Sequence, residues 1–361
     1  MTLRKRVNYL NSIEKRIKLR DYGWHDEYLP ADAVGIPGRV TAAHRDRVEV
    51  LTERGPCEAK LRGSATYRDE LMPVTGDWVL LDWQEGGQGR IARTLPRRTA
   101  LSRPDAAYGG HREQVVAANF DVAFLLSSLN HDFNLRRLER YLTAAWQSGA
   151  TPVVVLTKRD LMNDCNAQLR AAERVAVGAA VHAVSSATGE GLEKLQTYLK
   201  PGTTAVFLGS SGVGKSSLVN ALAGEELMAT GAIREDDSRG RHTTTHRQLL
   251  RLRSGVLVID TPGMRALGMW DVSEGLGESF ADVEQFFGRC RFRDCRHQSE
   301  PGCAVRAAID SGELSAERWE SYQNLKREAK YADDPDSYLR RKTERNKQIA
   351  KFSRELKKRR P

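Results

Sequence analysis

Cysteine is scarce in this sequence, and long apolar runs are missing from it. Five cysteines among 361 residues are too few for a disulfide framework, and their odd number argues against one. No stretch approaches eighteen consecutive apolar residues, which excludes a transmembrane helix. The first twenty residues are charged and lack the apolar core of a secretory signal. We therefore expect a cytoplasmic protein with no membrane partner.

What is present is the composition of a folded chain, with 40% hydrophobic and 29% charged residues. A chain of 361 residues is too long for one ordinary core, so two or three domains are expected. Positive charge gathers at the ends, because residues 1–20 carry a net +6 and residues 326–361 a net +8, whereas the whole chain carries +10. These ends predict a polyanionic partner, nucleic acid first, although merely solvated helical ends would carry the same charge.

The apolar pattern divides the chain into four regions. Residues 1–33 form a basic N-terminal arm. Within residues 34–102, five short alternating segments broken by Gly, Pro and Asp predict a small β-barrel; an OB fold is favoured, and an SH3-like barrel would give nearly the same pattern. Residues 103–280 alternate continuous apolar strands with helical stretches, which predicts a mostly parallel α/β sheet with helices on both faces. Residues 281–361 hold a cysteine-rich segment and a basic helical tail.

A phosphate-binding loop is predicted at residues 209–216. The run GSSGVGKS fits G-x-x-x-x-G-K-[ST], follows the apolar strand TAVFL and precedes a helical stretch. Its glycines let backbone N–H groups point at phosphate oxygens, and the helix start adds positive potential. We expect Lys215 to reach the β- and γ-phosphates as a catalytic group and the Ser216 hydroxyl to coordinate Mg²⁺. The predicted nucleotide contacts here are Gly209, Ser210, Ser211, Gly212, Val213, Gly214, Lys215, Ser216 and Ser217.

Two later segments are candidates for sensing the γ-phosphate. The run DTPG follows the strand GVLVI, so Asp260 is expected to control Mg²⁺ and the Gly263 N–H to face the γ-phosphate. The polar run RGRHTTT, residues 239–245, suits a mobile segment from which one of three adjacent threonines, Thr244 among them, joins the Mg²⁺ shell. A simple solvated loop is the alternative for that run.

Base recognition is predicted from TKRD, which ends the apolar strand PVVVL. An aspartate at this place accepts hydrogen bonds from N1–H and N2–H of guanine, whereas adenine offers no such donor pair. We therefore expect Asp160 to select guanine and the Lys158 stem to pack over the purine. The run SSA ends a further strand and resembles the segment whose backbone amide meets guanine O6. The predicted base-side residues are Thr157, Lys158, Arg159, Asp160, Ser185, Ser186 and Ala187.

The order of these motifs is permuted. In most small GTPases the phosphate loop comes first and the base-reading motifs last, whereas here TKRD and SSA precede GSSGVGKS and DTPG. A parallel sheet can be assembled from either order if the usual termini are joined and the chain is opened elsewhere. The order predicts a circularly permuted GTPase domain that binds GTP or GDP with Mg²⁺. Its segment 260–263 leads directly into the C-terminal domain, so a change of nucleotide would be passed on to that domain.

A structural zinc site is predicted at Cys290, Cys295, His297 and Cys303. Three thiolates and one imidazole within fourteen residues form a soft ligand set, typical of one tetrahedral Zn²⁺ with closed coordination and no metal catalysis. Free surface thiols beside a histidine are the alternative. The two remaining cysteines, Cys57 and Cys165, are expected to be small buried hydrophobes.

A small barrel, a permuted GTPase domain and a Cys₃His segment together resemble the RsgA family of GTPases. The resemblance implies GTP hydrolysis stimulated by the small (30S) ribosomal subunit, a role in late maturation of that subunit, and rRNA binding through the barrel and zinc domains. We also expect a monomer. The matching landmarks, over roughly residues 34–310, are GDWV (76–79), AANFD (117–121), TKRD, GSSGVGKSS, GRHTTT, DTPG and C-x4-C-x-H-x5-C.

Two departures from the general GTPase pattern bear on activity. Met264 follows DTPG where many GTPases place a glutamine that orients the attacking water, so intrinsic hydrolysis should be slow. In the family this substitution is usual, and His242 becomes the candidate catalytic residue, with a structural or RNA-contacting role as its alternative. Thr157 replaces the commoner asparagine and removes an amide that braces the phosphate loop, so weaker nucleotide affinity is expected.

The sequence allows one alternative to a GTPase and disfavours another. A non-catalytic or switch-only RNA-binding assembly factor is allowed by the barrel, the zinc segment and the missing glutamine. An ATP-using P-loop kinase is disfavoured, because TKRD and SSA would then have no role.

Overall fold

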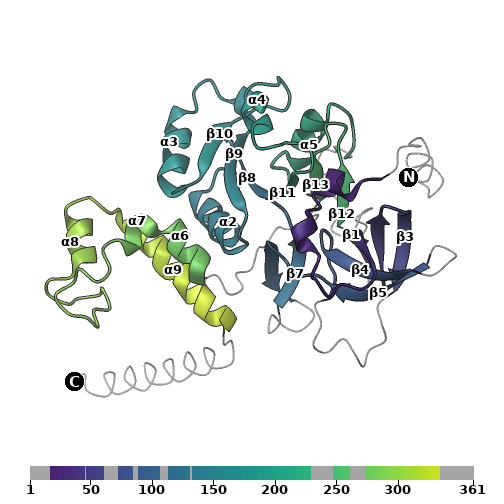
Figure 1. Ribbon diagram of the computed structural model, residues 1–361. Coiled ribbons are helices and arrows are strands. Elements are labelled where there is room, and N and C mark those ends of the chain that lie inside the picture. The colour runs from purple at the N-terminus through teal and green to yellow at the C-terminus, as the bar shows by residue number, and fades with distance from the viewer. Residues whose placement is uncertain are drawn as a thin grey trace, which may run out of the picture.

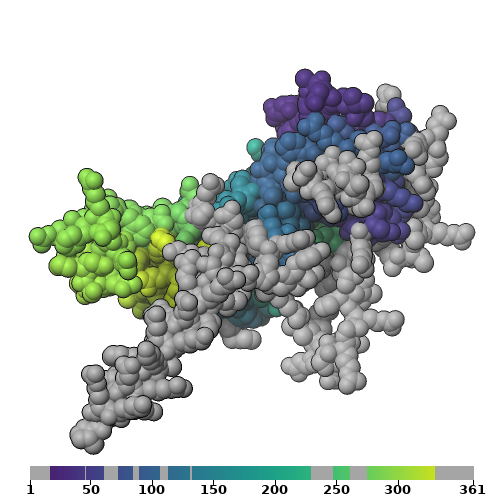
Figure 2. Space-filling model, turned by 90° about the horizontal axis from the view of Figure 1, so that it is seen from below, coloured from purple at the N-terminus to yellow at the C-terminus, as the bar shows by residue number. Residues whose placement is uncertain are grey.

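The computed structural model describes residues 17–44, 46–60, 72–83, 88–105, 113–130, 132–228, 247–260 and 273–333. Three parts follow one another along the chain: a β-barrel, an α/β sheet domain and a helical C-terminal part (Figure 1). Seen from below in Figure 2, the C-terminal part forms a lobe beside the rest of the molecule. Among the described helices, none is both long enough and apolar enough to cross a bilayer.

The barrel consists of the five short strands that the sequence predicts. Neighbouring strands run in the order β1-β2-β3-β5-β4, and β4 pairs back with β1, which closes an OB-like barrel. Side chains that alternate along the strands, such as Val50, Val79 and Ile91, fill its interior. Cys57 also lies there, and burial raises the pKa of its thiol to about 11. The strands are β1 (Ile36–Ala43), β2 (Arg47–Thr52), β3 (Gly55–Lys60), β4 (Trp78–Trp83) and β5 (Gln88–Thr94).

The described chain before the barrel is packed on the barrel rather than free. Leu19 and Trp24 are buried against Trp78, Leu80 and their neighbours, on the face of β4 opposite the interior residues. Trp24 and Trp78 meet edge to face with ring centroids 4.8 Å apart. The expected basic arm is therefore folded from residue 17 to 33, and residues 1–16 lie outside the described chain. Two short 3-10 helices form this segment: η1 (Leu19–Tyr22) and η2 (Asp26–Tyr28).

The central sheet is parallel over five strands, in the order β10-β9-β8-β11-β13, as the continuous apolar runs predict. Its most buried strand, β8, exposes none of its seven residues appreciably. Cys165 is also buried, as expected. The strands are β8 (Val122–Ser128), β9 (Thr151–Thr157), β10 (Ala180–Ala183), β11 (Thr204–Gly209) and β13 (Leu257–Asp260).

Helices cover both faces of this sheet. Leu138, Leu142 and Ala172 belong to one buried cluster, whereas Leu195 and Leu218 belong to a second cluster on the opposite face. This two-sided cover explains why the strands read as unbroken apolar runs. The first face carries α2 (Leu135–Gln147) and α3 (Asn166–Val175), and the second carries α4 (Leu192–Gln196) and α5 (Lys215–Ala223).

Three strands were not predicted. A hairpin of β6 (Ala100–Pro104) and β7 (Glu113–Ala118) joins the barrel to the sheet and crosses the predicted boundary between residues 102 and 103. A short strand, β12 (Gln248–Arg251), runs antiparallel to β13. Because β12 also pairs with β1 at Ala42 and Gln248, barrel and central sheet are continuous within the described residues.

The C-terminal part has its own core of Phe280, Val283, Phe286, Val305 and Tyr322. It lies against the α/β sheet domain: α6 packs on α2, and α9 forms ion pairs with α2 (Figure 1). Its helices are α6 (Ser273–Ser279), α7 (Ala281–Glu284), α8 (Ala304–Asp310) and α9 (Ala316–Asp333).

Candidate nucleotide and metal sites

The predicted phosphate loop connects the end of β11 to the start of α5. Gly212 and Gly214 have φ angles of 75° and 100°, in the region that side chains disfavour, so the backbone of the loop favours glycine at both positions. Val213 between them is buried, 1% exposed, and anchors the loop to the sheet. Gly214 directly precedes α5, whose first N–H groups are available to bind an anion.

Thr157 braces this loop from the neighbouring base-side strand. Its buried hydroxyl donates a hydrogen bond of 2.6 Å to the carbonyl of Val213. The loop therefore keeps a brace from this strand although the asparagine amide is absent, and the weaker nucleotide affinity stays a prediction. A hydroxyl is sufficient because β9 and the loop lie close together, with the Thr157 side chain 3.9 Å from a Cβ built on Gly214.

Lys215 and Asp260 are brought together by the sheet. Strands β11 and β13 are parallel neighbours, so their carboxyl ends meet at one edge. There the Lys215 Nζ lies 3.1 Å from Asp260 Oδ1, with both side chains about one-fifth exposed. Ser216 is half-buried in the first turn of α5. Three other predicted residues lie outside the described chain: His242, Thr244 and Gly263.

On the base side, Asp160 is held by Ser185. The Ser185 hydroxyl is fully buried and donates to Asp160 Oδ1 at 2.5 Å, while Asp160 itself is exposed. The Arg159 N–H donates to the Val184 carbonyl at 3.0 Å, which ties the two loops together. Lys158 has a left-handed backbone, with φ at 61°, and turns the chain sharply after β9. The Asp160 carboxylate is thus held in one orientation by Ser185.

The remaining base-side residues have local partners. The Arg159 guanidinium lies 3.7 Å from Glu190 and donates to the Met162 carbonyl. The Ala187 N–H donates to the Ser185 hydroxyl at 3.2 Å, and Ser186 is half-buried.

The base-reading loop and the phosphate loop lie at the same edge of the sheet. Strand β8 runs between β9 and β11, in register with Thr157 beside Ser128 and Gly209 beside Leu126. Two strand spacings separate the loops by about 10 Å. This is the crevice at the carboxyl ends of the strands where open α/β sheets bind ligands.

Sequence reasoning missed one residue at this edge, Asp132. Its Oδ2 accepts a hydrogen bond of 2.6 Å from the Ser210 hydroxyl of the phosphate loop. Arg137 Nη1 contacts both Asp132 oxygens, at 2.9 and 3.0 Å. The sequence holds only a weak signal, the polar run NHDFN after an apolar strand; the structure shows that this strand lies next to the phosphate-loop strand.

The four predicted zinc ligands converge in the C-terminal part. Their ligand atoms all lie within 4.8 Å of one another, the one such group containing cysteine in the described chain. His297 Nδ1 is 3.5 Å from the sulfurs of both Cys290 and Cys303. Bonds of about 2.0–2.3 Å to a tetrahedral Zn²⁺ require ligand separations of this size. The cluster therefore fits one zinc ion, held by Cys290, Cys295, His297 and Cys303.

Comparison with known proteins gives consistent matches. The family model described as RsgA GTPase matches residues 94–270. A Lactiplantibacillus plantarum protein named small ribosomal subunit biogenesis GTPase RsgA 2 is 47% identical, over 82% of this chain and 84% of its own. A Streptomyces coelicolor protein named small ribosomal subunit biogenesis GTPase RsgA is 46% identical, over 86% of each chain.

Solved structures agree with these matches. The crystal structure of YjeQ from Thermotoga maritima has a TM-score of 0.61 at 31% identity, covering 80% of this chain and 96% of its own. That of YloQ, described as a circularly permuted GTPase, has a TM-score of 0.55 at 26% identity, covering 84% of this chain and 96% of its own.

Proposed function

This chain belongs to the RsgA family of GTPases, and from that premise we propose that it acts in late maturation of the small ribosomal subunit. The GTP-bound protein docks on rRNA, the subunit stimulates hydrolysis, and hydrolysis drives release. The observation that carries the proposal is the meeting of Asp160 and the phosphate loop at one sheet edge, in permuted chain order. Such a role belongs to the cytoplasm.

Guanine selection rests on Asp160 and Ser185. The Ser185 hydroxyl holds one carboxylate oxygen of the exposed Asp160. The side chain therefore loses little conformational entropy when the carboxylate accepts hydrogen bonds from N1–H and N2–H of guanine. An adenine in the same place would leave the carboxylate without its donors. The Lys158 stem packs over the purine, and the SSA segment supplies an amide to O6.

Phosphate binding rests on an exchange of partners at Lys215. In the structure, its ammonium pairs with Asp260 at 3.1 Å. When GTP binds, Lys215 turns to the β- and γ-phosphates, and Asp260 and Ser216 are left to hold Mg²⁺. The bound ion would neutralise charge that develops on the phosphate oxygens. His242, Thr244 and Gly263 are assigned to water orientation, the Mg²⁺ shell and γ-phosphate contact by their sequence positions alone.

Docking on rRNA rests on a basic loop, residues 289–296, which contains the zinc ligands Cys290 and Cys295. Four exposed arginines carry its charge, and Phe292 among them is 43% exposed. Arg291 lies over the Phe292 ring, with its Cζ 5.6 Å from the centroid. An exposed ring flanked by guanidinium groups suits base stacking and phosphate contact in single-stranded or looped RNA. Zinc would be structural here and would fix the shape of the loop. The arginines are Arg289, Arg291, Arg293 and Arg296.

Single-turnover hydrolysis with and without purified small subunits tests the proposal. We expect slow hydrolysis alone and a large acceleration by small subunits but not by large ones. Unaccelerated hydrolysis would favour the switch-only assembly factor. The Asp160→Asn variant should lose GTP affinity and gain affinity for xanthine nucleotides, and unchanged GTP affinity would overturn the assignment of Asp160.

Sedimentation with small subunits tests the basic loop. The double variant Arg291→Ala/Phe292→Ala should pellet less with subunits in a non-hydrolysable GTP analogue, whereas Arg170→Ala, an exposed arginine on α3, serves as the matched control. Rising salt should weaken docking of the wild type steeply, because counterions are released when arginines contact phosphates. Equal pelleting of variant and control would remove this loop from the docking surface.

A further inference from the structure

Asp132 lies outside the phosphate loop and the base-reading motifs, yet its side chain touches the phosphate loop. It belongs to the short connection between β8 and α2, 78 residues before Ser210 in the chain. The Ser210 hydroxyl donates to Asp132 Oδ2 at 2.6 Å. This is a short hydrogen bond to a charged acceptor, the stronger class of such bonds.

The position of Asp132 is fixed by the start of α2. Asn134 caps this helix, because its side-chain oxygen accepts from the Arg137 N–H at 2.9 Å. The Asn130 side-chain oxygen accepts from the Asp132 N–H at 2.9 Å and from the Ser128 hydroxyl at 2.8 Å. The turn is therefore closed by its own side chains, and the carboxylate is held in place by a helix rather than by a loose loop.

Arg137 matters because a carboxylate beside a phosphate site would repel the nucleotide. Arg137 Nη1 lies 2.9 and 3.0 Å from the two Asp132 oxygens, and both side chains are about one-third exposed. The Asp132–Arg137 pair has almost no net charge, while Asp132 Oδ2 still accepts a hydrogen bond from the Ser210 hydroxyl. The arrangement keeps the hydrogen bond and cancels most of the repulsion.

We propose that Asp132 is a positioning residue of the phosphate loop, holding Ser210 near the beginning of the loop while Thr157 holds Val213 near its end. Two braces keep the backbone N–H groups convergent before phosphates arrive, so less ordering is required on binding. Arg137 allows a carboxylate to do this next to a polyanion. This inference rests on the proposed nucleotide site.

Binding of a fluorescent GDP analogue to full-length variants tests the brace. Ser210→Ala and Asp132→Ala should each raise the dissociation constant about 3- to 10-fold, the range expected for one hydrogen bond. The double variant should have a dissociation constant no higher than that of the single variant that binds less tightly, because both substitutions remove the same contact. Asp132→Asn, which keeps an acceptor oxygen for Ser210, should bind better than Asp132→Ala.

Arg137 gives a readout that a purely structural role would not produce. Arg137→Gln leaves an unneutralised carboxylate, so it should weaken GDP binding most at low salt, and adding Asp132→Asn should restore affinity. Arg136→Gln is the control, since Arg136 pairs with Glu320 of α9 instead, at 2.9 Å, and should bind as the wild type does.

Three results would each overturn the proposal. The first is unchanged GDP affinity in both Ser210→Ala and Asp132→Ala, and the second is a loss of affinity in their double variant equal to the product of the two single losses. The third is that Asp132→Asn does not restore the affinity of Arg137→Gln. Thermal unfolding of each variant shows that it is folded. If Asp132→Ala does not fold, Ser210→Ala and the Arg137 pair decide the matter. A wild-type protein that binds no GDP would instead remove the proposed nucleotide site itself.

Discussion

The barrel and the C-terminal part are attached to the GTPase domain by different physical means, although each attachment centres on a buried arginine. At the barrel, the fully buried Arg39 donates to two backbone carbonyls, those of Tyr22 and of Asn119, the latter at 2.7 Å. At the C-terminal part, Arg318 of α9 meets two carboxylates, Glu139 of α2 at 2.7 Å and Asp282 at 2.9 and 3.0 Å, and it also donates to the Ser279 carbonyl at 2.6 Å.

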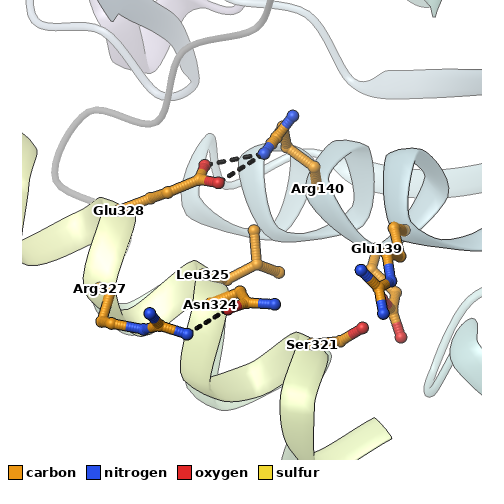
Figure 3. Close-up of a pocket in the computed structure, with 8 residues that line it drawn as sticks. Glu139, Arg140, Ser321, Asn324, Leu325, Arg327 and Glu328 are labelled. Atoms are coloured by element: carbon orange, nitrogen blue, oxygen red, sulfur yellow. Dashed lines mark hydrogen bonds and ion pairs between the residues drawn. The ribbon is translucent and has the colours of Figure 1, made fainter. Parts of the chain in front are cut away.

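The surroundings of the two arginines differ in the same way. Gly76 of the barrel lies so close to β7 that a Cβ there would be 2.1 Å from the Ala118 carbonyl. Strand β1 of the barrel also pairs with β12 of the central sheet. Between α2 and α9, by contrast, lies a polar groove of about 400 Å³, crossed by the Arg140–Glu328 ion pair at 2.7 Å (Figure 3). The barrel is joined through a continuous sheet, whereas the C-terminal part is joined through close packing of α6 on α2 and through ion pairs from α9.

This difference bears on nucleotide response. The barrel is continuous with β12 and β13, which border the two segments that hold His242 and Gly263. The C-terminal part rests on α2, the helix that begins beside Asp132 and the phosphate loop. Charge pairs can exchange partners more readily than a continuous sheet can. We therefore expect the C-terminal part to be the one that shifts with nucleotide state.

Arg318→Met should have the largest effect on this comparison. It leaves Glu139, whose side chain is 4% exposed, buried without its partner, and breaking such a pair costs about 3–5 kcal/mol. Hydrogen exchange of α9 amides measures the loss, and barrel amides should keep their protection. Arg318→Met/Glu139→Leu should recover part of it, since no buried charge then remains. Loss of protection in both parts would contradict separate attachments.

Gly275→Ala should come next. A Cβ at Gly275 in α6 would lie 2.2 Å from the Thr143 carbonyl of α2, so the helices must separate, at a cost of about 1–3 kcal/mol for overpacking. Gly277→Ala is the matched control in the same helix, because its Cβ meets only the Glu284 side chain at 3.5 Å. The control should stabilise by roughly 0.5–1 kcal/mol through helix propensity. Equal effects on chemical unfolding would mean that α6 does not depend on close approach to α2.

Local chemistry in the site was predictable from the sequence, whereas long-range contacts were not. The motifs predicted that Lys215 and Asp260 would come together, because motif spacing and strand order place both at one sheet edge. Asp132 was missed because its partner is 78 residues away and belongs to another motif. Arg318 was missed for the same reason, with Glu139 lying 179 residues away. Charged residues are common in any sequence, and only the fold shows which of them are buried.

The fold shows the same division. Long apolar runs such as residues 122–129 predicted the central strands, because burial on both faces demands them. The four-residue strand β12 has only one buried position, at Leu249, and carries no comparable signal. Its place is determined by pairing with β13 and β1, which are far apart in sequence.

Arg39→Met tests the barrel side and should cost less than Arg318→Met. The change leaves two carbonyls without their donor, at about 1–3 kcal/mol each, but it also removes a buried charge. Burial makes that charge unfavourable and lowers the pKa of Arg39 to about 10. The losses partly cancel, and hydrogen exchange of β1 and β4 should show a net loss of about 1–2 kcal/mol. A loss as large as that of Arg318→Met would show that the barrel attachment is equally ionic in character.

The smallest effect should be a change in pH dependence at Asp77, beside Arg39 at the barrel junction. Burial raises the pKa of Asp77 above its ordinary 3.8, although Arg97 donates to it at 2.7 and 2.9 Å. The folded protein thus holds this proton more tightly than the unfolded chain does. The stabilisation is full below pH 3.8 and is lost as pH rises through the raised pKa. Relative to Asp77→Asn, which cannot titrate, the wild type should lose unfolding free energy over that range, as measured by chemical unfolding. A relative gain would mean that Arg97 outweighs burial, and that the barrel, like the C-terminal part, is held by a favourable ion pair.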